Sequence, residues 1–322
     1  MGHTARRADA KVGDMGEQGP RVLVMLGVCD GVEQLPELLD SILAQQGVQL
    51  TLRVCDDCST DGSRKVLREY AQQHECIVTS RNGRTLGPDV TYAQLIAEAD
   101  AGAYDFFAFA QQGDVWQPDK LAVAAGCISA SAPQPELYYA GVNVVDEAGE
   151  QLGNRYAACK RMAAKPLSVL VAETWASAGT MLFNRMLLRF LQQHRNTDFG
   201  RSYATWVFAV CVCLGGRVYD DVEQAYVSRH AAAGEGLQPY DEGGSAIERG
   251  AQAAAARTKL ARKLVDAYEP LMEADLNEIV LAVAYRSESF ACRLELATCE
   301  RITMPTRLRS ARLRLSLLSK FF

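Results

Sequence analysis

The chain has 322 residues, a formal net charge of −5 at pH 7, 48% hydrophobic residues and 23% charged residues. This length can bury the core of one large domain or of one and a half domains, and the composition is typical of globular proteins. The negative charge argues against a general nucleic-acid-binding protein. No apolar run approaches the roughly 20 residues of a membrane span. Residues 1–20 lack the apolar core of a signal peptide and are expected to form a disordered leader, so we expect a cytoplasmic protein.

The first 120 residues alternate apolar, β-rich runs with amphipathic segments of helical period. Strands are expected at residues 21–28, 50–57, 76–80 and 105–110, with helices at 33–47, 59–73 and 89–99 between them. This βαβ spacing predicts an α/β fold with a mostly parallel sheet flanked by helices. Ligands should bind at the carboxyl ends of the strands.

The pattern is looser after Leu121. A strand is expected at 136–146, a loop at 147–165, a strand leading into a helix at 178–194, an apolar helix at 203–216, and a short strand or hairpin at 217–230. From Gly250 onward the sequence has helical period and almost no residues that break helices. We therefore expect a leader at 1–20, an α/β domain at 21–245 and a helical C-terminal extension at 246–322.

The last segment, residues 307–322, carries five basic residues and no acid, and its leucines and phenylalanine follow a helical stripe. One interpretation is peripheral contact with an anionic membrane at its inner face. The other is a helix docked on the protein with solvated arginines. The sequence leaves both open.

The stretch "VCDDCSTDGS" places Asp56 and Asp57 at the end of the second expected strand and Asp61 at the start of a helix. Carboxylates there can accept hydrogen bonds from a base and from ribose hydroxyls. Helix capping by Ser59 or Thr60 is the alternative, but it would not need the Asp-Asp pair.

The same stretch contains Cys55 and Cys58 at the spacing of a redox motif. The two acids between them should raise the thiol pKa values and so disfavour a reactive thiolate. Four scattered histidines pair with no cysteine at the spacing of zinc ligands.

From about Arg21 to His230 the chain resembles the inverting family 2 glycosyltransferases, which have the GT-A fold, and within them a bacterial rhamnosyltransferase-like branch. The resemblance rests on a strand followed by Cys29-Asp30-Gly31, on "SILAQ" at 41–45, and on the Asp-Asp-x-Ser-x-Asp-Gly signature at 56–62. It implies that Asp30, Asp56, Asp57 and Asp61 bind the nucleotide.

A further family signature, Asp-Gln-Asp-Asp-Val-Trp-x-Pro-x-Lys-Leu, matches residues 111–121, and the resemblance places Gln111, Gln112, Trp116 and Lys120 in the donor and acceptor cleft. In the family the Asp-x-Asp holds a divalent cation, Mg²⁺ or Mn²⁺, on the donor diphosphate. Gln111 and Gly113 stand at those two positions. The implied cation therefore keeps one weak candidate ligand, Asp114, which is also a candidate catalytic residue.

Three later sequence motifs of the family are matched only in part. The segment "ASAGTMLFNR" matches a turn that shapes the acceptor side, with Gly179 and Thr180. The family's His-Asp-Trp-Trp motif, whose Asp is the general base, matches residues 204–207. The resemblance places Thr205 and Trp206 in the donor and acceptor cleft, and because Thr205 stands at the position of the base, the loop residue Asp198 is the remaining upstream candidate. Arg229 and His230 match a signature that would contact a diphosphate, while solvated polar residues at a strand end are the alternative.

Two functions follow from the resemblance. The first is transfer of a sugar, with rhamnose as a candidate, from a nucleotide-sugar donor to a surface polysaccharide or a lipid-linked glycan. The second is a non-catalytic relative that binds a nucleotide sugar or a partner transferase as a scaffold. A redox protein that uses Cys55 and Cys58 is a third, less favoured hypothesis.

Overall fold

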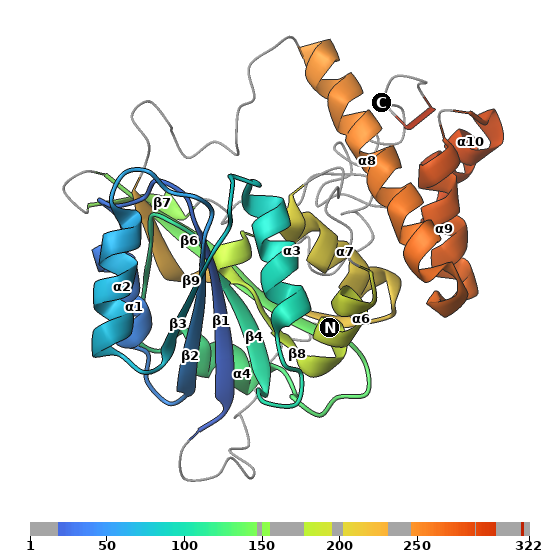
Figure 1. Cartoon of the computed structure of the whole chain (residues 1–322). Coiled ribbons are helices and arrows are strands. Elements are labelled where there is room, and N and C mark those ends of the chain that lie inside the picture. The colour runs from blue at the N-terminus through green and yellow to red at the C-terminus, as the bar shows by residue number, and fades with distance from the viewer. Residues whose placement is uncertain are drawn as a thin grey trace.

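A computed structural model gives the structure of the protein (Figure 1). It describes residues 19–146, 150–154, 177–194, 202–230, 246–286, 288–300 and 317–318, and every structural statement below concerns these residues. Most of Asp198's loop and most of the basic tail lie outside them.

The sheet begins as a parallel sheet and becomes mixed. Four parallel strands lie in the order β3-β2-β1-β4: β1 (Arg21–Val28), β2 (Gln49–Asp56), β3 (Ile77–Arg81) and β4 (Phe106–Ala110). The order then continues β8-β6-β9-β5, with β5 (Asp114–Trp116), β6 (Glu136–Val145), β8 (Leu182–Asn184) and β9 (Arg217–His230). In this half β6 and β9 are parallel, whereas the β4–β8, β6–β8 and β5–β9 pairs are antiparallel.

Alternate residues of β1 point to the two faces of the sheet, and both faces are covered (Figure 1). Val22, Val24 and Leu26 pack with the helices of one layer, α1 (Leu35–Leu43), α2 (Ser63–Gln73) and α4 (Lys120–Cys127). Leu23 and Met25 pack with the other layer, α3 (Pro88–Glu98), α6 (Arg185–Gln193) and α7 (Tyr203–Cys213). The continuous apolar pattern of the strand therefore reflects burial on both sides.

The C-terminal helices are α8 (Ala246–Tyr268), α9 (Ala274–Tyr285) and α10 (Phe290–Thr298). They share one hydrophobic core with α7, because the rings of Trp206 and Tyr268 lie 6.0 Å apart and Tyr268 Oη donates to the Phe190 carbonyl at 2.8 Å. Of the basic tail, Leu317 is buried in the same core. That contact favours docking of the tail at this residue.

Three elements differ from the expectations. β7 (Gln151–Asn154) lies in the expected loop and pairs with β6, and β9 is a single strand of 14 residues instead of a short strand or hairpin. β5 lies within residues 111–121, where no strand was expected, and it pairs with β9. β5 pairs with a strand more than a hundred residues away, and β7 and β9 pair with β6 in bulged registers. Local sequence patterns report neither feature.

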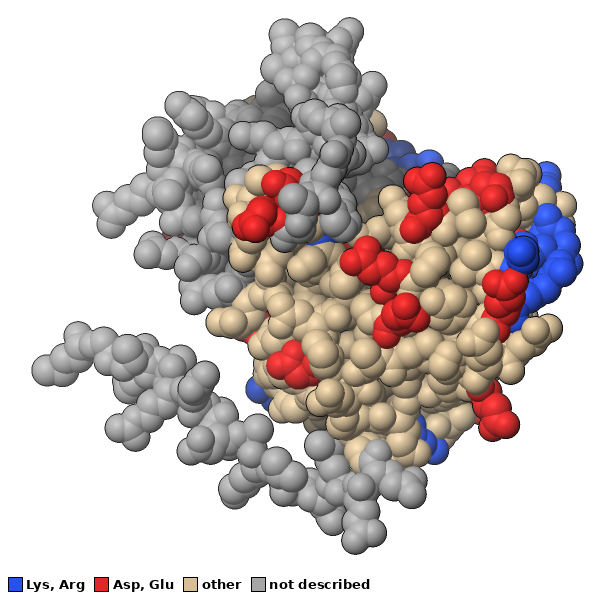
Figure 2. All heavy atoms as spheres, turned by 90° about the vertical axis from the view of Figure 1, so that its left-hand side faces the viewer, with Lys and Arg blue, Asp and Glu red and all other residues tan. Residues whose placement is uncertain are grey.

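No helix among the described residues is long and apolar enough to cross a membrane. On the face that Figure 2 shows, acidic side chains are scattered over the surface, and the basic side chains collect mainly at one edge. This distribution agrees with the negative net charge.

Candidate functional site

The candidate site lies where the carboxyl ends of β1, β2 and β4 meet. The loops that follow these strands begin at Cys29, Asp57 and Gln111. Because the three strands are parallel neighbours, these loops come together at one edge of the sheet, where open α/β sheets bind ligands.

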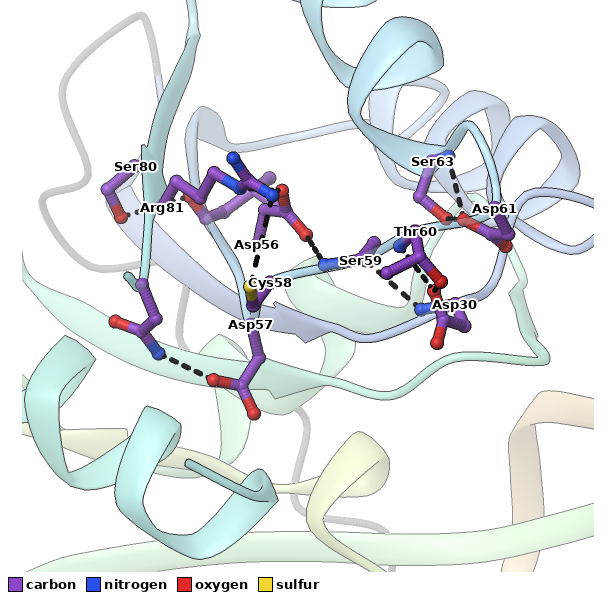
Figure 3. A network of polar contacts seen from close by, with 12 residues as sticks. Asp30, Asp56, Asp57, Cys58, Ser59, Thr60, Asp61, Ser63, Ser80 and Arg81 are labelled. Carbon is purple, nitrogen blue, oxygen red and sulfur yellow. Dashed lines mark hydrogen bonds and ion pairs between the residues drawn. The ribbon is translucent and has the colours of Figure 1, made fainter. Parts of the chain in front are cut away.

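Asp56 and Asp57 are buried at the end of β2, with 2% and 3% of their surface exposed. Asp56 accepts a hydrogen bond from Ser59 N at 2.9 Å and forms an ion pair with Arg81 Nε at 3.2 Å (Figure 3). Burial of a carboxylate requires such partners, because an unsatisfied buried charge costs several kcal/mol. Asp56 therefore holds the β2 loop against β3.

Asp57 holds the loop that leads into α3. Its two oxygens accept from Asn82 Nδ2 at 2.7 Å, from Leu86 N at 2.9 Å and from Gly87 N at 2.8 Å. Leu86 and Gly87 directly precede α3, so this carboxylate fixes the start of that helix. Asp57, the second acid of the Asp-Asp pair, therefore has a structural role that capping of α2 would not explain.

Asp30 and Asp61 are exposed and join the β1 loop to the β2 loop (Figure 3). Asp30 Oδ1 accepts from Thr60 N at 2.7 Å, and Asp61 Oδ2 accepts from Val32 N at 2.9 Å. Asp61 Oδ1 accepts from the Ser63 hydroxyl at 2.6 Å, and this bond holds the pKa of Asp61 below its usual value. The four predicted nucleotide-binding carboxylates therefore lie together, and each one accepts hydrogen bonds within the protein.

The two cysteines of the possible redox motif lie on either side of the Asp56-Asp57 pair. Cys55 is buried within β2, and burial raises the pKa of its thiol. Cys58 is partly buried, and both side chains are free thiols. A raised thiol pKa disfavours the thiolate that redox exchange requires.

The altered metal signature forms a closed polar cluster around Arg229. Asp114, fully buried at the start of β5, lies opposite Arg229 of β9 in the antiparallel register. Arg229 Nε donates to Asp114 Oδ1 at 2.6 Å, and Arg229 Nη2 forms an ion pair with the same carboxylate. Arg229 Nη2 also donates to Gln111 Oε1 at 3.1 Å and to Ser177 Oγ at 3.3 Å.

Gln111 and the turn before β8 complete this cluster. Gln111 Oε1 also accepts from Ser177 Oγ at 2.6 Å and from Gly179 N at 3.1 Å. A Cβ at Gly179 would lie 2.0 Å from Asp114 Oδ2, so only glycine allows the turn to approach this closely. We call Gln111, Asp114, Ser177, Gly179 and Arg229 the Arg229 cluster.

Gln112 points toward the β1 loop. Its side-chain oxygen accepts from Cys29 N at 2.6 Å, and its side-chain nitrogen donates to the Cys29 carbonyl at 3.2 Å. This amide pairs with the backbone as a strand neighbour would, and it also packs on Gly31. The two amides of the "AQQGD" stretch therefore organise the loops: Gln112 bonds to the backbone of Cys29, and Gln111 bonds to the turn before β8 and to Arg229.

Trp116, at the end of β5, and Lys120, at the start of α4, are both buried. The Lys120 ammonium lies 3.5 Å from the centre of the Trp116 ring, which is a cation–π contact. Burial lowers the pKa of Lys120 to about 7, while the charge of Asp114 opposes that shift. Both side chains are buried, and their place in the donor and acceptor cleft stays a prediction.

Replacement of Lys120 with methionine should change the pH dependence of stability. An unfolded lysine has a pKa near 10.4, so between about pH 7 and pH 10 the unfolded chain holds a proton that the folded chain lacks. The wild-type free energy of unfolding should therefore rise with pH in this range, by up to about 1.4 kcal/mol per unit. Urea unfolding of both proteins at pH 7, 8 and 9 tests this: the difference between wild type and Lys120→Met should change with pH, and a constant difference would contradict it.

The described residues of the altered signature do not fit a divalent cation. Mg²⁺ and Mn²⁺ prefer carboxylate oxygens. Here Gly113 offers no side chain, the Gln111 oxygen already accepts three hydrogen bonds, and the Asp114 carboxylate is paired with a guanidinium. A dication at this position would also be repelled by Arg229. The described part of the chain contains no other group of three or more acids, histidines or cysteines placed to hold a metal.

The position of the family's base is not occupied by an acid. Thr205 is buried at the start of α7, where Ser202 Oγ caps the helix and lies 3.0 Å from Thr205 Oγ1. Trp206 is 1% exposed and lies in the core rather than at a cleft surface, because α7 is buried along its whole length. Asp198 lies outside the described residues. Asp221, another acid on β9, accepts from Tyr138 Oη at 2.9 Å, several residues along the strand from Arg229.

His230 is the last residue of β9, opposite Val145, and its side chain lies outside what the structure describes. Thr180 is buried and donates to the Ser177 carbonyl at 2.9 Å.

Two residues near the site were not expected from the sequence. Ser177 lies just before the Gly179 turn, so the matching turn motif could have indicated it. Asp89, in the first turn of α3, accepts from Tyr203 N at 2.9 Å and so lies next to the start of α7. No local pattern brings these two helices together.

The fold and site define a class: an α/β protein with polar loops gathered at the carboxyl edge of its parallel strands. Residues 26–141 match the model of the family described as "Glycosyl transferase family 2". A dTDP-rhamnosyl transferase, RfbG of Shigella flexneri, is 28% identical over 96 residues, which is 29% of this chain and 33% of the relative. A putative glycosyltransferase, EpsE of Bacillus subtilis, is 38% identical over 56 residues, covering 17% and 20%. The matched parts thus span a third or less of these curated relatives.

Solved structures resemble the fold over most of the chain. Residues 1–349 of S. aureus TarS, in complex with UDP-GlcNAc, superpose with a TM-score of 0.55 at 16% identity, and the match covers 94% of this chain and 80% of that TarS chain. The mannosyltransferase PcManGT of Pyrobaculum calidifontis, in complex with GDP-Man and Mn²⁺, gives 0.51 at 16% identity and covers 94% and 86%. These findings confirm the resemblance to family 2 glycosyltransferases and the GT-A-like fold.

Proposed function

We propose that this chain is an inverting glycosyltransferase that takes its sugar from a nucleotide-sugar donor. The observation that carries the proposal is the gathering of the three loops at one sheet edge, within a segment that matches the family 2 model. Support also comes from the fold relatives, whose titles name complexes with UDP-GlcNAc and GDP-Man.

The proposed reaction is a single displacement at the anomeric carbon. An acceptor hydroxyl forms a new C–O bond while the bond from that carbon to the donor diphosphate breaks, and the nucleoside diphosphate leaves with the electron pair. The acceptor proton passes to a base or to water. The loops of β1 and β2, fixed by Asp30, Asp56, Asp57 and Asp61, would shape the nucleotide side of this site.

Rhamnose from dTDP-rhamnose is our proposed donor sugar, because one relative carries the name dTDP-rhamnosyl transferase. A surface polysaccharide or a lipid-linked glycan is our proposed acceptor. A cytoplasmic location, with peripheral contact to the inner face of the membrane through the basic residues of 307–322, would bring the protein to such an acceptor. Leu317 itself packs in the core, so this contact would come from the basic side chains around it.

A second candidate function is a non-catalytic relative that binds a nucleotide sugar or a partner transferase. The observation that favours it is the burial of Thr205, whose hydroxyl cannot act as a base at neutral pH, at the position of the family's base. The two candidates agree on donor binding and differ on turnover.

Turnover of sugar nucleotides separates the two candidates. The full chain is incubated with dTDP-rhamnose, UDP-GlcNAc or GDP-mannose, with and without a glycan acceptor, and release of nucleoside diphosphate is measured. Release that depends on acceptor, with one donor preferred, would support transfer. Calorimetric binding without release would favour the non-catalytic relative, and the absence of both would contradict the proposed function.

A further inference from the structure

We propose that Arg229 supplies the positive charge that faces the donor diphosphate, so that this site binds nucleoside diphosphates without a divalent cation. The inference rests on the proposed function and concerns how the same site holds its donor. It starts from the mismatch between the cation that the family signature implies and the residues that stand there.

The first argument is position. The family signature places its cation ligands at the positions of Gln111 and Gly113, and the guanidinium of Arg229 bonds directly to Gln111 and to the neighbouring Asp114. Arg229 thus lies at the signature although it is 115 residues away from Asp114 in the chain. The antiparallel pairing of β5 with β9 sets that placement.

The second argument is orientation. Three residues fix the guanidinium, because Nε and Nη2 donate to Asp114, Gln111 and Ser177. The closeness of Gly179 to Asp114 holds the carboxylate in turn. A cation fixed before the ligand arrives loses little conformational entropy on binding, which strengthens its contact with an anion.

The third argument is charge. The implied family arrangement balances two carboxylates with one dication, so the ligand-free site would be close to neutral. This chain has lost both carboxylates, and the remaining Asp114 is balanced by Arg229. An added dication would lie beside the guanidinium with a single carboxylate to hold it, so Arg229 itself is the cation that this cluster can present to a diphosphate.

The fourth argument is access. The Arg229 side chain remains 22% exposed, while its partner Asp114 is fully buried. The cation is therefore nearer to solvent than the anion, as a site for an anionic ligand requires. Arginine also suits phosphate oxygens, because its charge is permanent and is spread over a planar group with five N–H donors.

Calorimetric titration of the full chain with dTDP, UDP and GDP tests the inference. Each titration is done in EDTA and again with Mn²⁺ at saturating concentration. We expect the wild-type dissociation constant for the preferred nucleotide to change by less than about twofold between the two buffers. Arg229→Gln should weaken binding in EDTA by about ten- to a hundredfold, the range for loss of a charge-assisted hydrogen bond.

Arg217→Gln is the matched control, because Arg217 is an exposed arginine on the same strand. It should bind the nucleotide as the wild type does. Arg229→Gln leaves Asp114 buried without its charge partner, so folding is monitored by thermal unfolding. The double variant Asp114→Asn/Arg229→Gln removes both charges and should show the same loss of affinity if the single variant does not fold.

The outcomes distinguish this inference from the function on which it rests. Wild-type binding that strengthens tenfold or more with Mn²⁺ would overturn the role of Arg229 and leave the proposed function standing. Wild-type affinity in the folded Arg229→Gln or double variant would also overturn it. No binding of any nucleoside diphosphate in either buffer would overturn both the inference and the proposed function.

Discussion

Replacement of Asp114 with alanine should lower the free energy of unfolding by about 3–5 kcal/mol, because it removes one partner of a buried ion pair. The carboxylate is fully buried, and it accepts the Arg229 Nε hydrogen bond at 2.6 Å. Its loss leaves the guanidinium without a counter-charge between Gln111 and Ser177. Urea unfolding with linear extrapolation measures the change.

The control for this experiment is a pair of similar chemistry at the surface. Glu288 and Arg262 form an ion pair whose side chains are 60% and 44% exposed, so Glu288→Ala should change stability by about 1 kcal/mol or less. Asp114→Asn should cost less than Asp114→Ala, since the amide oxygen can still accept from Arg229. A cost for Asp114→Ala no larger than that of the surface control would mean that the Arg229 cluster does not stabilise the fold.

Replacement of Asp57 with alanine should destabilise the protein by about 2–4 kcal/mol, because it leaves several donors without their acceptor. The donors are Asn82 Nδ2 and the backbone amides of Leu86 and Gly87, at 2.7–2.9 Å from the carboxylate. The start of α3 should loosen first. Hydrogen exchange of the Leu86 and Gly87 amides, followed by mass spectrometry of the peptide that contains them, should become faster.

Asp100→Ala is a suitable control, since Asp100 is exposed and accepts one local hydrogen bond, from Gly102 N at 2.7 Å. Its effect on stability should be small, and exchange near α3 should not change. Asp57→Ala should also weaken nucleotide binding, because this loop borders the proposed nucleotide side. If exchange at Leu86 and Gly87 stays at the wild-type rate, the role assigned to Asp57 is wrong.

The first half of the fold could be predicted from local patterns. The strands β1 to β4 and the helices between them have bounds within a few residues of those expected, because buried strands and amphipathic helices differ in length and period. The edge at which Asp56, Asp57 and Gln111 gather follows from parallel pairing alone. The same reasoning could not find β5 or the full length of β9, since those strands depend on pairing with distant segments. It also missed β7, a strand of four residues that pairs with β6 in a bulged register.

The sequence predicted which segments form the candidate site, but it did not predict which contacts each side chain makes. Trp116, Lys120 and Trp206 are buried, and their expected place in the cleft stays a prediction. Motif spacing reports where a side chain starts along the backbone, whereas exposure depends on what packs over it. Ser177 and Asp89 were missed because their partners come from distant segments.

By itself the sequence determined the α/β class, the sheet edge that carries the loops, and the replacement of two expected acids by Gln111 and Gly113. These features depend on residue type and on periods of two or 3.6 residues, which a single sequence records directly. Only the tertiary structure decided that Arg229 lies against Asp114. That contact forms because β5 pairs with a strand more than a hundred residues later, and long-range pairing is set by the packing of the whole sheet.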